Sequence, residues 1–271
     1  MSTSTKWQLA RTAAEQYEAV LVPSILGPAA EALVAWAAPE PGEVVVDIGC
    51  GTGAAARHAA VRVARGGRVT GVDVNDGMLG VARSLPAEAG APIEWRQGSA
   101  DALPLDEGSA DLALCAQTLQ FLHDRASAVA EAHRVLRPGG RLAVSVWREL
   151  SESPYFAALV EAVSTRIGPE TASGLRAAFA MPDASEIGDL LKRAGFDEVQ
   201  VVSAQIELEL PAAEAFVPVH IGATPMSAGY RSGSLEDQAA VVRDVAEAMA
   251  EYSTEGGLRV PFSMHLVGGS R

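Results

Sequence analysis

The chain has 271 residues, of which 48% are hydrophobic and 20% are charged. This length and composition fit one large α/β domain or a core domain with a cap, and they exclude a disordered chain. The formal net charge of -13 disfavours nucleic acids and anionic membrane surfaces as partners, because like charges repel, and it suits a cationic ligand.

The cysteines and the start of the chain predict a soluble, cytoplasmic protein. Cys50 and Cys115 lie in apolar, strand-like segments, and neither has a neighbouring cysteine or histidine at the spacing of a zinc site. Met1 to Trp7 is polar, and no apolar run approaches the roughly 20 residues of a membrane helix. We therefore expect reduced thiols, no metal site, no secretion signal and no membrane span.

The region 43–147 alternates strand and helix patterns at the spacing of βαβ units. Strands are expected at 43–48, 68–73, 93–97, 111–116 and 141–147. Helices are expected at 54–64, from a capping Asp76 to about Pro86, and at 124–136, where the Pro and Gly residues of 137–140 end the helix. This order predicts a doubly wound sheet with its ligand crevice at the carboxyl ends of the strands.

The remaining segments are less regular and are interpreted as parts that cover the crevice. An amphipathic helix is expected at 184–194, a strand at 198–202, a helix at 235–251 and a last strand at 259–268. We expect residues 1–40 to form an N-terminal helical lid over a core at 41–148. Residues 149–182 and 211–257 are expected to be substrate cap insertions, and 183–210 with 258–271 the rest of the core.

A glycine-rich loop, Asp47 to Gly53 (DIGCGTG), links the first strand to the first helix. Its spacing alone also fits a dinucleotide fingerprint. However, Asp47 lies where a pyrophosphate would approach, and a carboxylate there repels phosphate but attracts an ammonium or a sulfonium. Gly53 offers a third close backbone approach. Asp73, at the end of the second strand, can accept hydrogen bonds from both hydroxyls of a ribose in either class of nucleotide.

Five segments resemble the successive motifs of class I S-adenosylmethionine-dependent methyltransferases, in the branch that contains the ubiquinone and menaquinone biosynthesis enzymes. They are VVVDIGCGTG (44–53), VTGVDVNDGML (69–79), GSADALPL (98–105), ADLALCAQTLQFLHD (110–124) and RVLRPGGRLAVSVW (134–147). The resemblance covers about residues 12 to 200. It implies a Rossmann-like, mostly parallel seven-stranded sheet, S-adenosyl-L-methionine as the cofactor and a small molecule as the methyl acceptor.

The resemblance also assigns residues to the cofactor. The glycine loop (Asp47, Gly49, Cys50, Gly51 and Gly53) would face the methionine part and Asp73 the ribose. Adenine would contact Val74, Met78, Ser99 and Ala100, and the backbone near Ala116 and Gln117 would hold the amino-acid end. Ser99 departs from the family, which often has aspartate there, so the adenine contact falls also to the Ala100 amide or to Asp101. Tyr17 would lie on the lid or fasten its helix down, and Met78 also fits a core position.

Candidate catalytic residues follow the fourth predicted strand. His123 fits a general base, which contributes roughly 10²–10⁴-fold where the acceptor has an acidic proton, or a residue at the start of the next helix. Gln117 or Gln120 could hydrogen-bond the substrate. The other histidines, His58, His133, His220 and His265, fit structural, packing or surface positions better. Trp147 fits either the pocket or the core.

The leading hypothesis is methyl transfer to O, C or N of a secondary metabolite or quinone-like compound with apolar or aromatic character. One alternative is an S-adenosylmethionine-binding protein that does not methylate, either a cyclase-type enzyme or a regulatory subunit. The other is an NAD-dependent oxidoreductase, which the carboxylate of Asp47 disfavours. The sequence leaves a homodimer open.

Overall fold

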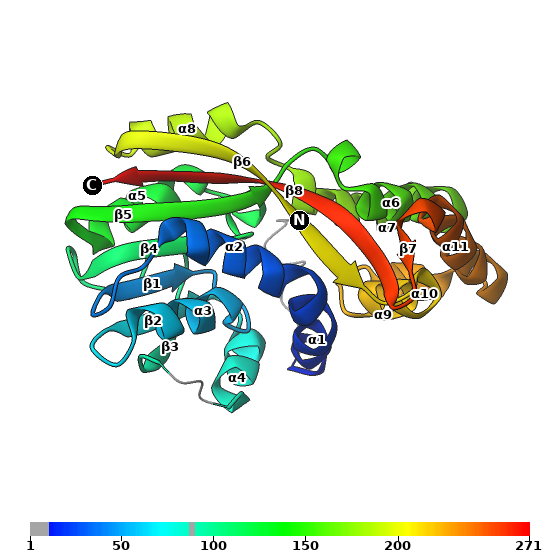
Figure 1. The fold of residues 1–271 in the computed structure, drawn as a ribbon, viewed down its shortest axis with the longest axis horizontal. Helices are drawn as coiled ribbons and strands as arrows, with labels where there is room; N and C mark the ends of the chain where they lie inside the picture. Colours follow the sequence, from blue (N-terminus) through cyan, green and yellow to red (C-terminus); the bar gives the residue numbers. More distant parts are fainter. Residues whose placement is uncertain (1–10, 87–89) are drawn as a thin grey trace.

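The computed structural model describes residues 11–86 and 90–271, and a mixed sheet runs through its centre (Figure 1). Five strands are mutually parallel: β1 (Val44–Ile48), β2 (Arg68–Asp73), β3 (Ile93–Gln97), β4 (Ala110–Ala116) and β5 (Leu136–Trp147). Antiparallel pairing adds β8 (Gly257–Ser270), β6 (Asp197–Leu210) and the short β7 (Ser253–Thr254). The order is β3-β2-β1-β4-β5-β8-β6, with β7 paired to β8 outside this path. The predicted Rossmann-like α/β fold is confirmed, with seven strands along the main path.

Helices cover both faces of this sheet because its central strands β1 and β4 carry buried apolar side chains on both faces. The first face is covered by the π-helix η2 (Tyr17–Leu26), α2 (Gly27–Ala37) and α3 (Ala54–Val63), while Ala14 of α1 (Arg11–Gln16) packs against Met78 and Val81. The second is covered by α5 (Arg125–Val135) and α8 (Ala184–Arg193), while α4 (Asp76–Ser84) flanks β2 and β3. Val45 belongs to the first core and its neighbour Val46 to the second, as the two-residue period of a strand requires.

A group of cap helices lies beyond the carboxyl ends of the parallel strands (Figure 1). It contains α6 (Pro154–Arg166), α7 (Pro169–Arg176), α9 (Ala213–Gly222), α10 (Ser227–Ser232) and α11 (Leu235–Ala248). Short 3-10 turns are η3 (Leu119–Phe121), η4 (Leu150–Glu152), η5 (Ala177–Phe179) and η6 (Ala250–Tyr252). The buried ring of Phe156 in α6 packs 5.0 Å from that of Phe262 in β8, measured between centroids. The cap helices therefore share one continuous apolar core with the sheet.

Three local predictions need correction. The helix that starts at Asp76 is capped by Asn75, whose Oδ1 accepts from the N–H groups of Gly77 at 2.9 Å and Met78 at 3.2 Å. β5 starts at Leu136, because residues 139 and 140 pair with the C-terminal backbone: Gly139 N–H donates to Arg271 O at 2.7 Å. β6 reaches Leu210 because the whole segment pairs with β8. Backbone hydrogen bonds with segments distant in the sequence thus make β5 and β6 longer than the sequence pattern predicts.

The N-terminal helices α1, η2 and α2 run without a break from Arg11 to Ala37. Among the described residues this is the single helical stretch long and apolar enough to cross a membrane, by length and composition alone. The prediction that no segment has this composition is therefore wrong. Leu21, Ile25 and Leu33 are buried in the core cluster that contains β1 and β4 residues, so the stretch packs on the sheet. Residues 1–10 of the expected lid lie outside the described residues.

Candidate active site

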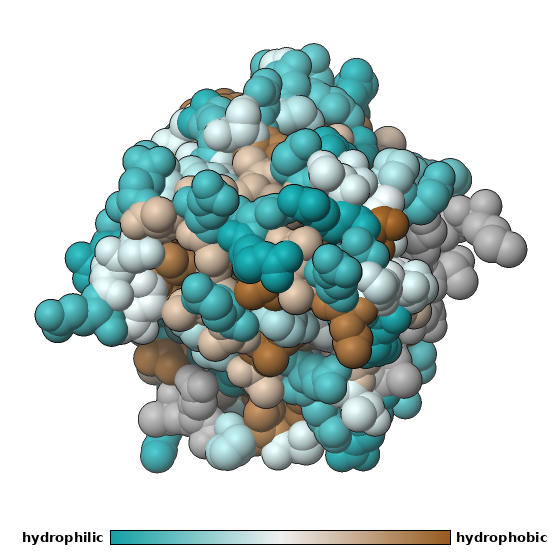
Figure 2. Space-filling view, turned by 90° about the vertical axis from the view of Figure 1, so that its right-hand side faces the viewer, coloured by the Kyte–Doolittle hydropathy of each residue, from teal (hydrophilic) through white to brown (hydrophobic). Residues whose placement is uncertain are grey.

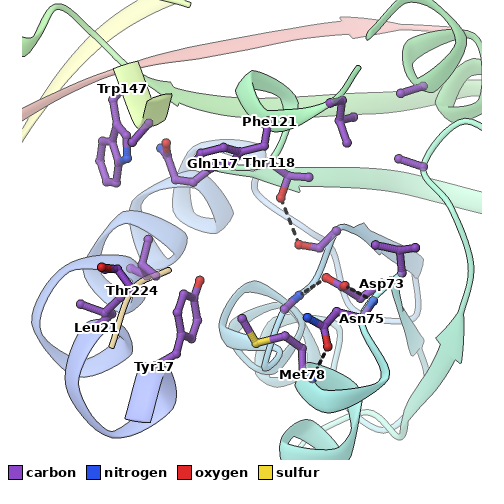
Figure 3. Close-up of a pocket in the computed structure, with 18 of the residues that line it drawn as sticks. Tyr17, Leu21, Asp73, Asn75, Met78, Gln117, Thr118, Phe121, Trp147 and Thr224 are labelled. Atoms are coloured by element: carbon purple, nitrogen blue, oxygen red, sulfur yellow. Dashed lines mark hydrogen bonds between the residues drawn. The ribbon is translucent and has the colours of Figure 1, made fainter. Parts of the chain in front are cut away.

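A pocket of about 320 Å³ lies at the carboxyl ends of the parallel strands, between the sheet and the cap helices. On the face of the molecule at the cap end, hydrophobic residues are visible between hydrophilic ones (Figure 2). Figure 3 shows Tyr17, Leu21 and Thr224 on one side of the pocket and Asp73, Asn75 and Met78 on the other. Residues from the N-terminal helix, the carboxyl ends of the five parallel strands and the cap therefore share one cavity.

Asp73 joins the glycine loop to the end of β2. Its Oδ2 accepts from Gly51 N–H at 2.8 Å, and its Oδ1 accepts from Asn75 N–H at 2.8 Å. Burial raises the pKa of this carboxyl above its usual value, although its hydrogen bonds with backbone N–H groups act in the opposite direction. A Cβ atom added to Gly51 would meet only the hydroxyl oxygen of Tyr17, at 3.9 Å. The backbone at Gly51 is thus open to the pocket beside a buried carboxylate.

The other two glycines of the loop make room for protein side chains. A Cβ atom on Gly49 would lie 2.2 Å from Thr118 Cγ2, and one on Gly53 would lie 2.2 Å from a ring carbon of Trp95. Thr118 Oγ1 also donates to Gly49 O at 3.0 Å. Gly49 still lines the pocket, but Gly53 does not. Gly53 therefore packs against Trp95, and its close approach to a ligand stays a prediction.

Asp47 lies under the loop and is absent from the pocket lining. It is 1% exposed, and its Oδ2 accepts from Ala56 N–H at 2.9 Å, which caps the first turn of α3. Its Oδ1 has no hydrogen-bond partner among the described residues. Burial, together with the nearby charge of Asp73, raises the pKa of Asp47 to about 7. The carboxylate of Asp47 thus points to the start of α3, and its expected contact with the methionine part stays a prediction.

Cys50 and Ala116 are two further predicted cofactor residues outside the pocket lining. Cys50 is buried, and its Sγ lies 3.7 Å from Gly51 O. The carbonyl of Ala116 accepts from Thr118 Oγ1 at 3.1 Å. Both residues therefore support the loop that forms the pocket wall.

The residues predicted to contact adenine do line the pocket, together with Asn75, which sequence reasoning missed. Val74 is 52% exposed, whereas Met78 is buried and packs with Ala14 and Val81. The hydroxyl of Ser99 donates to Asp101 Oδ1. Ala100 and Asp101 complete this wall. Met78 thus has both roles that the sequence left open, because it lines the pocket and also belongs to a small core cluster.

The candidate catalytic residues after β4 do not all line the pocket. Gln117 and His123 line the pocket, but Gln120 does not. Gln117 is buried with a left-handed backbone (φ 51°), and its Oε1 accepts from Gln120 Nε2 at 3.2 Å. Its own Nε2 has no partner among the described residues. Gln120 therefore lies behind Gln117 and orients its amide group.

The far end of the pocket is apolar and was largely missed by the sequence analysis. It is lined by Leu21, Ile25, Leu26, Trp147, Phe156, Leu175, Ala178, Thr224, Met226 and His220. Trp147 also packs on Phe262 at 4.2 Å between ring centroids, so it belongs to the pocket and to the core. The only available signal was the apolar composition of the cap segments, which fits an ordinary core equally well.

The four histidines other than His123 differ in their surroundings. His220 is buried in the cap, lines the pocket and shares a hydrogen bond of 2.9 Å between its Nδ1 and the Tyr155 hydroxyl. Burial lowers its pKa to about 3. His265 Nε2 pairs with Pro182 O at 2.9 Å, and His133 packs edge-on against Phe196. His265, His133 and His58 are outside the pocket lining, so their predicted structural roles remain the simpler interpretation.

Comparisons with known proteins agree with this architecture. The family described as a methyltransferase domain matches residues 46–144. The chain is 31% identical over 203 residues to nocamycin O-methyltransferase of Saccharothrix syringae, covering 70% of this chain and 72% of that one. It is 30% identical over 162 residues to ubiquinone biosynthesis O-methyltransferase of Pseudomonas aeruginosa, covering 59% and 67%. The solved YcgJ protein of Bacillus subtilis shares the fold with a TM-score of 0.57 at 17% identity, over 90% of this chain and 97% of that one.

Proposed function

The chain belongs to the class I S-adenosylmethionine-dependent methyltransferases, and we propose that it methylates a hydroxyl oxygen of a small, apolar, ring-containing acceptor. One observation carries the proposal: a single pocket connects the glycine loop and Asp73 to an end lined by apolar side chains. Two of its relatives are O-methyltransferases by name, which supports oxygen over carbon or nitrogen as the acceptor atom.

The residues around Asp73 fit the nucleoside part of S-adenosylmethionine. Each carboxylate oxygen of Asp73 accepts one backbone hydrogen bond and keeps a lone pair for a ribose hydroxyl. Gly51 leaves space where a side chain would project into the pocket. Val74 and Met78 offer apolar surface to the adenine ring. Ser99 gives its hydroxyl proton to Asp101, so its oxygen remains an acceptor for the adenine amino group.

The acceptor is proposed to bind at the apolar end, between η2 and the cap helices. When bound, S-adenosylmethionine supplies a methyl group on a sulfonium: an acceptor lone pair forms the new O–C bond while the C–S electrons go to sulfur and the hydroxyl proton goes to solvent. The chain contributes mainly alignment and exclusion of water in such a displacement. Leu21, Trp147 and Phe156 would surround the acceptor ring and exclude water from it.

Gln117 and His123 are proposed to act at the junction between the two ends of the pocket. The unpartnered Nε2 of Gln117 can donate a hydrogen bond to the acceptor or to the amino-acid end of the cofactor. Gln120 is a positioning residue, because it contacts the Gln117 amide from outside the pocket. His123 lies at the rim and is the pocket-lining histidine that remains available as a base.

The partners, the location and the roles of the helical segments are part of the same proposal. The net charge of -13 favours a small molecule over nucleic acid or an anionic membrane as the partner. The free, buried thiols of Cys50 and Cys115 support the reducing cytoplasm as the proposed location. The N-terminal helix is proposed to act as a lid and the helices of 149–182 and 211–257 as the substrate cap. A homodimer is tested directly by light scattering of the purified chain.

The experiment is to incubate the protein with methyl-labelled S-adenosylmethionine and a panel of phenols, hydroxyquinones, aromatic amines and enolisable ketones. Mass spectrometry should find label on a hydroxyl oxygen, with S-adenosylhomocysteine formed in equal amount. Label only on nitrogen or carbon would contradict the proposed acceptor atom. Binding without consumption across a broad metabolite extract would favour the alternative of a non-methylating protein.

A further inference from the structure

We propose that His220 recognises the acceptor through its Nε2–H group, with Tyr155 holding the ring in that tautomer, and that the acceptor is a hydroxyl compound conjugated to a carbonyl. Such a compound, a hydroxyquinone or another vinylogous acid, loses its proton to solvent and does not require His123 as a base. The inference rests on the proposed O-methylation and names its substrate class.

The first step is the tautomer of His220. Tyr155 and His220 come from α6 and α9, are 1% and 3% exposed, and have nearly parallel rings with an interplanar angle of 20°. The Tyr155 hydroxyl has no hydrogen-bond partner among the described residues other than His220 Nδ1, at 2.9 Å. A buried phenol must donate its proton to avoid the cost of an unmade hydrogen bond. Nδ1 therefore accepts, and the ring proton lies on Nε2.

The second step is the charge of the ring. His220 packs against Phe156 and Phe216, with ring centroids 5.3 and 5.4 Å away, and against Tyr155. Burial is the sole cause that lowers the pKa of His220 to about 3, and no charged side chain contributes. A neutral imidazole of this low basicity cannot remove a proton from a phenol at neutral pH. His220 is therefore a hydrogen-bond donor to the acceptor and not a general base.

The third step is what a ligand must offer. Nε2 of His220 forms no hydrogen bond with the rest of the described chain, although the residue lines the pocket. Nearby, Thr224 gives its hydroxyl proton to Ile221 O at 2.7 Å, so its oxygen acts as an acceptor. The remaining walls at this end are mostly apolar. A flat ring with a carbonyl or an ionised oxygen satisfies Nε2–H, and conjugation between that carbonyl and the hydroxyl lets the acceptor ionise by itself.

The binding test uses 2-hydroxy-1,4-naphthoquinone and 2-naphthol as matched probes, titrated by calorimetry into protein saturated with S-adenosylhomocysteine. The wild type should bind the naphthoquinone roughly 10- to 100-fold more tightly, the range for a hydrogen bond to a charged group. H220F and H220Q should lose most of this preference, whereas H133Q, on α5 outside the pocket, should retain it. Equal affinity of the two probes for the wild type, or an unchanged preference in both His220 variants, would overturn the proposal.

A second measurement needs no acceptor. Nitrogen-15 spectra of histidine-labelled protein should show His220 protonated on Nε2 alone and unchanged between pH 5 and 9. Y155F should give a mixture of tautomers and a weaker probe preference, an effect that loss of packing alone does not produce. A His220 signal that titrates in this range overturns the proposal. If no hydroxyl compound is methylated, the proposed function fails, while the tautomer and the probe preference still report separately on His220.

Discussion

The indole ring of Trp95 occupies the space that a side chain on Gly53 would need. A Cβ atom at Gly53 would lie 2.2 Å from one ring carbon and 2.8 Å from another. The same ring lies 2.5 Å from the Cβ position of Gly71 in β2. Trp95 in β3 thus packs over two glycines that precede it by 42 and 24 residues. The third glycine of the loop is required by packing inside the protein.

Gly53→Ala should therefore destabilise the fold. The φ of Gly53 is +93°, which an L-residue adopts only with strain, and the added methyl group would displace Trp95. We expect the free energy of unfolding to fall by about 2–4 kcal/mol in a denaturant titration. Gly139→Ala is the matched control, because Gly139 has φ +79° but no atom within 4 Å of its Cβ position. Its loss should be about 1 kcal/mol. Equal losses in both variants would show that Trp95 is not the cause.

Asp73→Ala should weaken the binding of S-adenosylhomocysteine. The variant removes the proposed ribose contact and the acceptor of the Gly51 and Asn75 N–H groups. The expected loss is about 1.5–3 kcal/mol, or roughly 10- to 150-fold in affinity by calorimetry. Asp76→Asn is the control, since Asp76 starts α4, pairs with Arg83 at 3.3 Å and lies outside the pocket lining. An affinity for the Asp73 variant equal to that of the wild type would rule out the ribose assignment.

Asp47 should make the stability depend on pH in an unusual direction. Its pKa rises from 3.8 to about 7 on folding, chiefly through burial, so the folded state binds this proton more tightly than the unfolded state. The stabilisation by this group is complete below pH 4 and is lost as the pH rises to 7 and above. Asp47→Asn has no proton to lose. The unfolding free energy of the variant minus that of the wild type should therefore increase across pH 4–7.

The size of this change is at most about 4 kcal/mol, from a shift of roughly three pKa units. Denaturant titrations at pH 4, 5.5, 7 and 8 measure it. The comparison with Asp47→Asn cancels the opposite contribution of carboxyls such as Glu131, whose pKa is lowered by its hydrogen bond with Arg134. A difference that stays constant over the whole range would mean that Asp47 does not titrate as its burial requires.

Ala178→Leu should affect the acceptor and leave the cofactor alone. Ala178 is in η5 and lines the apolar end of the pocket, so three extra carbon atoms would reduce the space for an acceptor ring. We expect the kcat/KM for the acceptor to fall at least about tenfold while the affinity for S-adenosylhomocysteine stays within about twofold. Ala180→Leu, at an exposed position two residues later, should change neither. A parallel loss of cofactor affinity would place both ligands at the same end.

Local patterns predicted much of the fold and the end of the pocket around Asp73. The residues concerned follow consecutive strands within 43–124, and parallel strands bring their carboxyl ends to one edge. Asp73 is an example, because its place at the end of β2 is enough to put it in the crevice. The same reasoning does not predict the direction of the Asp47 side chain. Its position on β1 is correct, but the Ala56 N–H at the start of α3 decides which way its carboxylate points.

The sequence by itself determined the βαβ order, the glycine loop, the acidic end of β2 and the apolar character of the cap, because each depends on residues a few positions apart. Only the tertiary structure decided that β8 lies between β5 and β6, that Trp95 requires Gly53, and that Tyr155 meets His220 across 65 residues of chain. Periodicity shows which face of an element is buried, but not its partner. The partner is selected by packing and hydrogen bonding between segments that are distant in sequence.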